Sequence, residues 1–338
     1  MLDQIVAKTD GIPLFIEELT KTLLESNLLS EARDHYALSG PLPAMAIPTT
    51  LHDSLLARLD RLGPAKETAQ IAAALGREFS YELLSAVSGL REGELRDAIA
   101  QLTDAQLIFA RGRPPDATYR FKHVLVQETA YASLLKDRRQ QLHSRIARVL
   151  KGQFPERVAA EPEVLAHHHT AAGETDQAID QRLKAGQRAA ERSANLEAIA
   201  HLRRGLELLE YLPDTDERAR RELALQMALG MPLIAVEGYS GEETGAAYDR
   251  ARELCERVGD AQQLLPILYG QFVFRMARGA RPAAHQLAEE FVRLAEEQGE
   301  EGPALAARRL LGIALFQRGD PSASRTCLEK VLALYDSS

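Results

Sequence analysis

The second half of the chain repeats its own sequence with an offset of 40 residues. Small, large and turn residues recur in the same order when the segment from Leu265 is overlaid on the segment from Leu305. The matched positions are Leu265 with Leu305, Met276 with Phe316, Arg278-Gly279 with Arg318-Gly319, Ala283 with Ala323, Leu287 with Cys327, Phe291 with Val331 and Leu294 with Leu334. One copy of such a repeat cannot bury its apolar face alone, so successive copies must stack. This half is therefore predicted to be a mainly α array.

A spacing of small and large residues at i, i+4, i+8 and i+11 recurs earlier in the chain. It is found in Ala198, Leu202, Leu206 and Leu209, and with smaller side chains in Ala247, Ala251, Cys255 and Val258. The small residue lets a neighbouring helix come close, and the larger residues fill the groove beside it. The helix pairs resemble tetratricopeptide repeats, whose usual period is about 34 residues. We predict a tetratricopeptide-like α-solenoid over residues 137–338, with a surface for a protein partner or effector.

Residues 51–136 combine helical patterns with a predicted hairpin. Apolar residues at helical spacing occur in Leu51, Leu55, Leu59 and Leu62, in Ile71, Ala74 and Leu75 up to Gly76, in Tyr81 to Val87, and in Leu95, Ile99 and Leu102. Leu107–Ala110 and Thr118–Phe121 are predicted strands, and the turn between them holds Gly112, Pro114 and Pro115. Helices followed by a two-stranded wing predict a winged-helix domain.

Winged helices often bind DNA, but the charges of this one argue against direct DNA binding. The helix before the wing holds two arginines against Glu92, Glu94, Asp97 and Asp104. A net negative helix is repelled by phosphates. The formal charge of the chain is −8, whereas nucleic-acid-binding proteins usually carry a strongly basic surface. Internal packing is the preferred interpretation.

The first 50 residues predict a helix and a connector. Over residues 1–30, Pro13 falls in the first turn of a helix, where its missing N–H costs nothing. Residues 31–50 carry Pro41, Pro43 and Pro48, which predicts an extended linker.

The segment Thr9–Leu19 resembles the G-x-P-L-F-x-E-E-L element in the lid of signal-transduction ATPases of the STAND class. The following IPTTLHDSLLARLDRL (Ile47 to Leu62) is similar to the entry of the winged-helix subdomain in those proteins. Together they resemble most the ATPase and helical-repeat half of bacterial proteins that begin with a class III adenylate or guanylate cyclase. The resemblance implies that residues 1–30 are the C-terminal lid helix of a truncated NTPase domain, which would lie upstream.

In that family the Gly-x-Pro element lies against the adenine of bound nucleotide. The resemblance implies this role for Gly11 and Pro13, and implies that His123, in the segment Phe121–Tyr131, approaches the phosphates of ADP. Simpler interpretations stay open. Gly11 and Pro13 can merely shape a helix start, and His123 can be satisfied by backbone at a helix N-terminus.

The phosphate-binding part of that family is missing from this sequence. A P-loop needs Gly-Lys, and this dipeptide does not occur in the chain. We therefore expect no catalysis and no cofactor for this chain alone. ATP or ADP with Mg²⁺ is implied only for a full-length relative, with possible cyclase activity. Both ends of the sequence have the character of a fragment, since no polar cap closes the last repeat.

Other candidate sites are weaker. His167, His168 and His169 point about 100° apart on a helix, so they cannot converge on one ion, and no metal site is predicted. Gly238, Gly241 and Gly245 are expected to form a turn between solenoid helices. Cys255 and Cys327 lack a CxxC partner and indicate buried thiols in a reducing compartment. No signal peptide or apolar run of membrane length is found, so a cytoplasmic location without membrane contact is expected.

These features together predict a regulatory fragment of a STAND-type ATPase that senses a partner through its repeats. Two alternatives remain. The first is a fragment of an ATP-dependent transcription regulator of the maltose-regulator or LuxR-like type, and the second is a stand-alone protein-binding adaptor.

Overall fold

The structure, a computed structural model, describes residues 16–17, 20, 29–31, 36–38, 50–299 and 301–335. The chain divides into two compact units, Met1–Pro155 and Glu156–Ser338. The helix Lys136–Gln153 therefore belongs to the first unit, whereas the sequence assigned residues from 137 onward to the repeats. No described helix is both long and apolar enough to cross a bilayer.

A short strand pair lies near the N-terminus. β1 (Leu29–Glu31) pairs antiparallel with β2 (Tyr36–Leu38), and Leu29 is opposite Leu38. Leu29 and Ser30, at the end of the expected lid helix over 1–30, thus lie in a strand, because ladder hydrogen bonds join them to β2. β2 lies within the expected linker 31–50, so part of that linker is paired rather than merely extended.

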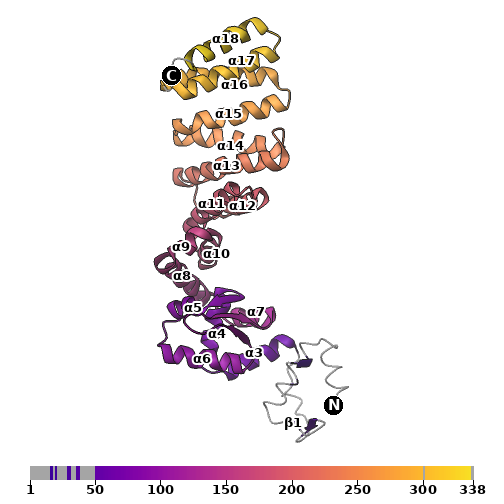
Figure 1. The fold of residues 1–338 in the computed structure, drawn as a ribbon, viewed down its shortest axis with the longest axis vertical. Helices are drawn as coiled ribbons and strands as arrows, with labels where there is room; N and C mark the ends of the chain where they lie inside the picture. The colour runs from indigo at the N-terminus through magenta and orange to yellow at the C-terminus, as the bar shows by residue number, and fades with distance from the viewer. Residues whose placement is uncertain are drawn as a thin grey trace. The chain divides into compact units, whose positions relative to one another are not determined.

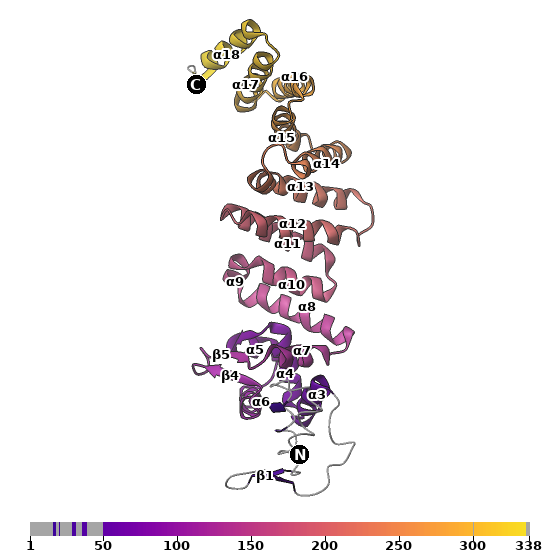
Figure 2. The same cartoon turned by 90° about the vertical axis from the view of Figure 1, so that its right-hand side faces the viewer.

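The rest of the first unit contains the predicted helices and one strand that sequence patterns missed. Its elements are α3 (Leu51–Arg61), α4 (Ala65–Leu75), β3 (Glu78–Ser80), α5 (Tyr81–Ser88), α6 (Glu92–Asp104), β4 (Ile108–Arg111), β5 (Thr118–Phe121), α7 (Val124–Ala132) and α8 (Lys136–Gln153). The strands form an antiparallel sheet in the order β3-β5-β4, and β4 and β5 can be followed in Figure 2.

Local chemistry explains where these helices begin and end. The hydroxyl of Thr50 accepts a hydrogen bond from the backbone N–H of Asp53 and caps α3, and Ser80 caps α5 in the same way through Leu83. Gly76 ends α4 and Gly89, in the left-handed region, ends α5. The predicted stop at Gly76 is confirmed.

The core of the first unit lies between these helices and one face of the sheet. Aromatic rings of Phe79, Tyr119 and Phe121 pack together, with the centroid of Phe79 5.8 Å from each of the other two. Fully buried leucines complete the core, among them Leu55, Leu59, Leu84, Leu95 and Leu102. The stripes predicted for α3 and α6 therefore face inward.

The second unit is a succession of helices. After the short α9 (Pro155–Ala160), its elements are α10 (Pro162–Ala172), α11 (Thr175–Glu191), α12 (Asn195–Leu209), α13 (Asp216–Glu237), α14 (Glu242–Val258), α15 (Ala261–Ala277), α16 (Arg281–Gln298), α17 (Glu301–Gln317) and α18 (Pro321–Tyr335). From α11 onward they form antiparallel pairs stacked in chain order (Figure 1). The pair α15–α16 maps onto α17–α18 with the predicted offset of 40 residues, so the helical-repeat prediction is confirmed.

Three overlapping clusters of buried residues run along the second unit. The first joins α11 to α14 through Leu202, Leu225 and Leu229. The next joins α13 to α15 through Leu223 and Ile267, and the last joins α15 to α17 through Phe272 and Leu310. The apolar face of each helix pair is therefore buried against the neighbouring pairs, as expected for stacked repeats.

Glycines permit the closest contacts between the helices of the second unit. A Cβ added to Gly186 of α11 would lie 2.5 Å from Cγ of Leu202 in α12. The ring of Tyr248 in α14 packs between Gly230 of α13 and Gly270 of α15, where an added Cβ would lie 2.6 Å from Cζ and 2.5 Å from Cδ1, respectively. Side chains at these positions would force the helices apart.

Three-residue turns, each with its central residue in the left-handed region, join the helices of three pairs. Gly279 follows α15 with φ of 73° and Gly319 follows α17 with φ of 86°. Ser193 occupies the same place after α11, with φ of 59°. Its N–H donates to the carbonyl of Ala190 as that of Gly279 donates to Met276. Ser193 thus adopts a conformation that favours glycine.

Replacing Ser193 by glycine should stabilise the second unit by about 0.5–1 kcal/mol, because the strain of a left-handed L-residue is removed. The midpoint of urea unfolding followed by circular dichroism measures this change. The reverse substitution, Gly279→Ser, is the matched control and should destabilise by a similar amount. A Ser193→Gly protein no more stable than the parent would contradict the prediction.

Candidate functional site

His123 lies where β5 passes into α7, at the N-cap position of that helix. Its side chain makes no capping hydrogen bond, and its Nε2 atom is buried with no partner among the described residues. The neighbouring Lys122 pairs with Glu17. A buried imidazole nitrogen without a partner is a group that a ligand can satisfy. The phosphate role of His123 stays a prediction.

Gly11 and Pro13, the other two predicted nucleotide contacts, lie outside the described residues.

The arginines of α6 are neutralised within their own helix. Arg91 pairs with Glu94, and Arg96 with Glu92 at 2.5 Å. The exposed cations of the hairpin, Arg111, Arg113 and Arg120, belong to β4, β5 and the turn between them. No guanidinium of α6 is thus without a carboxylate partner in the described chain, which leaves this helix poorly suited to phosphate contacts.

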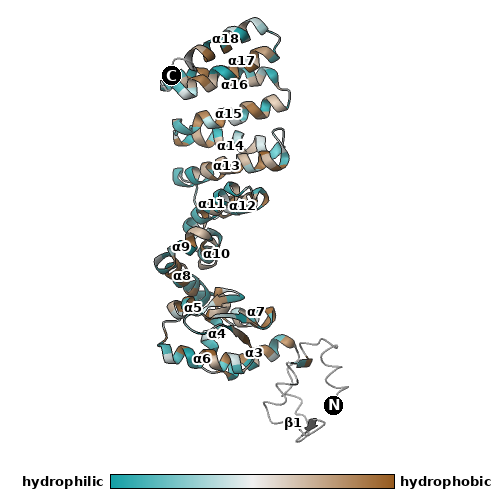
Figure 3. Ribbon diagram, viewed as in Figure 1, coloured by the Kyte–Doolittle hydropathy of each residue, from teal (hydrophilic) through white to brown (hydrophobic). Residues whose placement is uncertain are grey.

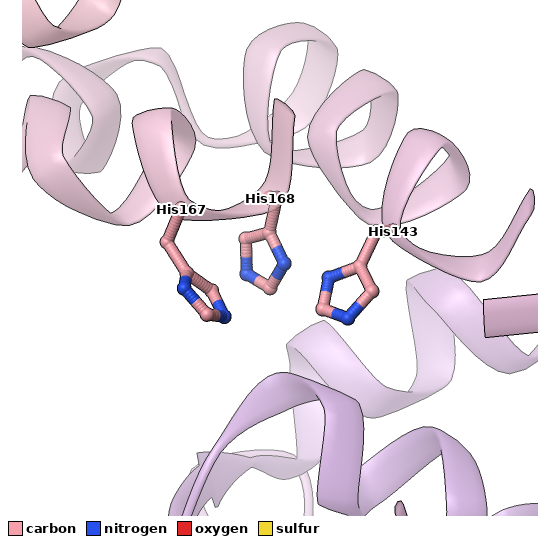
Figure 4. Close-up of side chains that lie close together, drawn as sticks. All are labelled: His143, His167 and His168. Carbon is pink, nitrogen blue, oxygen red and sulfur yellow. The ribbon is translucent and has the colours of Figure 1, made fainter. Parts of the chain in front are cut away.

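The predicted run of histidines lies on α10, as expected. The rings of His167 and His168 meet edge to face with centroids 5.3 Å apart (Figure 4). Nδ1 of His169 instead bonds to Glu174 Oε2 at 2.5 Å. Burial, and then the positive charge of Arg182, lowers the pKa of His167. The third histidine drawn in Figure 4, His143 of α8, has Nε2 2.9 Å from the hydroxyl of Tyr131 within the first unit. His169 thus points to a different partner from the adjacent pair.

The other weak candidates are explained by packing. Gly238 and Gly241 end α13 and begin α14, whereas Gly245 lies inside α14 against the ring of Phe274. Both cysteines are free thiols, Cys255 buried and Cys327 half-buried. Burial, and then the nearby carboxylates, raises the pKa of Cys255 and makes this thiol a poor nucleophile.

The first helices of three pairs (α13, α15 and α17) carry larger apolar residues outside the fully buried core. We name six of them the first-helix stripe: Met231 on α13, Tyr269, Val273 and Met276 on α15, and Ile313 and Phe316 on α17. Val273, Met276 and Ile313 are half-buried and pack against the core, whereas the other three are exposed.

The stripe follows from the repeat geometry. Tyr269, Val273 and Met276 are spaced by four and three residues, and adding 40 gives Arg309, Ile313 and Phe316 on α17. Met231, Tyr269 and Phe316 have exposed fractions of 67%, 42% and 64%. Brown and teal residues alternate along these helices in Figure 3, as expected for amphipathic elements.

Charged groups hold the helices that present the stripe. The carboxylate of Asp249 on α14 accepts hydrogen bonds from Gln271 at 2.6 Å and from Arg275 at 2.8 Å, both on α15. Arg252 of α14 reaches Glu290 of α16 at 2.8 Å. Because Gln271 is buried, this network fixes α15 against α14 with little freedom.

Tyr248 lies beside Tyr269 at the inner edge of the stripe. Burial, and then the proximity of Tyr269, raises the pKa of Tyr248, so its hydroxyl stays neutral at physiological pH. The sequence overlay matched Met276 with Phe316, but it did not show that Phe316 is exposed whereas Met276 is half-buried. That difference depends on which helix faces the stacked neighbours cover.

Comparisons with known proteins give similarity without an assigned function. No protein-family model matches the chain. An uncharacterized protein of Rhizobium meliloti (strain 1021) is 27% identical over 333 residues, covering 96% of this chain and 31% of that protein. The chain thus spans about a third of the length of this curated relative.

Two solved structures match the chain at low similarity. A Signal Transduction ATPase with Numerous Domains (STAND) protein with a tetratricopeptide repeat sensor, from Pyrococcus horikoshii, has a TM-score of 0.38 and 10% identity, covering 99% of this chain and 50% of that chain. BtubC (BKLC) from P. vanneervenii has a TM-score of 0.25 and 13% identity, covering 85% of this chain and 92% of that chain.

Proposed function

We propose that this chain is the regulatory part of a STAND-type ATPase and binds a protein partner through its helical repeats. The exposed members of the first-helix stripe, Met231, Tyr269 and Phe316, carry this proposal, because exposed large apolar residues on repeat helices are typical of a protein-binding surface. The order of the lid-like motif, the winged-helix-like elements and the repeats supports the ATPase class. A curated relative about three times as long is consistent with a chain that is one part of a larger protein.

The winged-helix assignment for residues 51–136 is supported by the order of its elements. α5 and α6 come between β3 and β4 in the chain, and the strands join in the order β3-β5-β4. Since the arginines of α6 pair with its own carboxylates, this domain serves packing within the protein rather than reading DNA.

In the proposed mechanism, nucleotide bound upstream by a P-loop domain contacts Gly11, Pro13 and His123 of this chain. Partner binding on the stripe shifts that arrangement and releases an output domain, such as a cyclase. This chain without Gly-Lys supplies no phosphate-binding loop and no hydrolysis; Mg²⁺ and ATP or ADP belong to the full-length protein.

The test of the partner surface is site-specific photo-crosslinking in the source cells, with the crosslinking residue at Phe316 on the stripe or at Leu196 on α12. Leu196 is the control because it is also exposed (74%) but lies on a second helix. A protein captured only from Phe316 should then bind Tyr269→Ser and Phe316→Ser chains about tenfold or more weakly, as for interface anchors, and Tyr211→Ser unchanged. Equal capture from both positions would overturn the proposal.

A second experiment distinguishes the proposed nucleotide-dependent regulator from the alternative of a stand-alone protein-binding adaptor. Nucleotide affinity is measured on the full-length protein with Pro13→Ala and His123→Ala. Weaker ADP binding supports the assigned contacts. Unchanged affinity would remove these residues from the nucleotide site and would favour a repeat domain that works without nucleotide.

A further inference from the structure

A cavity of about 640 Å³ lies in the first unit between α4 and α8. Its volume falls within the roughly 300–1,000 Å³ of small-molecule sites. Every residue that lines it lies between Gly63 and Arg148, so it contains none of the proposed nucleotide contacts. Ile71 and Leu142, both buried, give it an apolar floor.

The charged lining of the cavity is mostly positive. Four cations face it, Lys66 from α4 and Arg138, Arg145 and Arg148 from α8, against one carboxylate, that of Glu67. The spacing of the three arginines places them on one face of α8. The net charge of the cavity lining is thus positive, whereas the formal charge of the whole chain is −8.

These cations are not neutralised equally. Lys66 pairs with Asp60, and Arg138 lies 3.9 Å from Glu67, beyond hydrogen-bond distance. Arg145, half-buried, and Arg148 make no ion pair or hydrogen bond with any described residue. The second unit differs, since Arg250 there is held by Glu222 and Glu253. Two guanidinium groups therefore line the cavity without donating a hydrogen bond to any described residue.

We infer that this cavity binds a small molecule that carries two or more phosphate groups. Guanidinium groups match phosphate oxygens through paired hydrogen bonds, and a phosphate group with about −1.5 to −2 charges neutralises an unpaired arginine better than a carboxylate does. The apolar floor suits an organic portion such as a nucleoside. This site does not depend on the proposed ATPase function.

The test is isothermal titration of the 338-residue chain with inorganic pyrophosphate and, separately, with ATP. Arg145→Ala and Arg148→Ala should each weaken binding by about tenfold or more, the loss expected for hydrogen bonds to a charged group. Glu67→Gln should strengthen it. Arg96→Ala on α6 removes the same charge elsewhere in the unit and should leave binding unchanged.

Circular dichroism checks that each variant is folded, which matters most for Arg145 because it is half-buried whereas Arg148 is exposed. Equal affinity for pyrophosphate and ATP would show that the phosphate groups alone account for binding. Tighter binding of ATP would show that the apolar floor contacts the nucleoside. No binding of either probe, binding unaffected by both arginine substitutions, or binding of an acidic peptide alone would overturn the inference.

Discussion

Replacing Leu202 by alanine should lower the free energy of unfolding of the second unit by about 2–5 kcal/mol. Leu202 is fully buried in α12, where it packs with Ile199, Leu225 and Leu229. Its side chain lies directly against the bare backbone of Gly186 in α11. Because Gly186 has no side chain to move into the space, the substitution leaves a cavity at the contact between two helices.

Urea unfolding measures the loss, and hydrogen exchange locates it. Protection should fall first in α11–α13 and least in α17–α18, because stacked repeats contact only their neighbours. Leu196→Ala is the matched control on the same helix. It removes an exposed side chain and should change stability by less than about 0.5 kcal/mol. Losses of equal size at both positions would show that α12 is not buried as described.

Gly270→Ala should destabilise the second unit by about 1–3 kcal/mol, the usual cost of overpacking. The added methyl would lie 2.5 Å from Cδ1 of Tyr248. The ring cannot retreat, since the backbone of Gly230 lies on its other side. The helices α14 and α15 must therefore separate, at the place where Tyr269 of the first-helix stripe is presented.

Two further variants make the overpacking prediction specific. Gly302→Ala in α17, where no atom lies within 4 Å of the added Cβ, should be neutral or stabilise by up to about 1 kcal/mol. In a Tyr248→Leu background, Gly270→Ala should cost less than half as much as in the parent, because the ring atoms it meets are gone. Equal costs in both backgrounds would contradict this explanation.

The helices of this chain could be predicted from its sequence because their signals are local. The overlay of Leu265 on Leu305 placed α15 to α18 in two equivalent pairs, and the stop at Gly76 marked the end of α4. The strands were harder. β3 has three residues and buries only Phe79, so no alternation reveals it, and β1 and β2 are defined by pairing with each other rather than by their own composition.

The candidate sites could be predicted only in part. His123 was expected at a helix N-terminus and lies there, but its unpartnered Nε2 could not be read from a motif. Part of the first-helix stripe could be predicted, since the overlay matched Met276 with Phe316. The overlay did not show which face of these helices is exposed to solvent. The cavity between α4 and α8 was not predicted, because it depends on a packing contact between helices distant in the chain.

The repeated three-residue turns have a consequence for how such a protein can change in length. Gly279 and Gly319 each close a helix pair through the same backbone hydrogen bonds. An in-frame duplication or deletion of one complete pair, about 40 codons, would therefore preserve every junction while adding or removing one segment of exposed apolar surface. A deletion that removes part of a helix would place the rest of that helix out of phase with its neighbours. Natural variants of this array should accordingly differ by whole pairs.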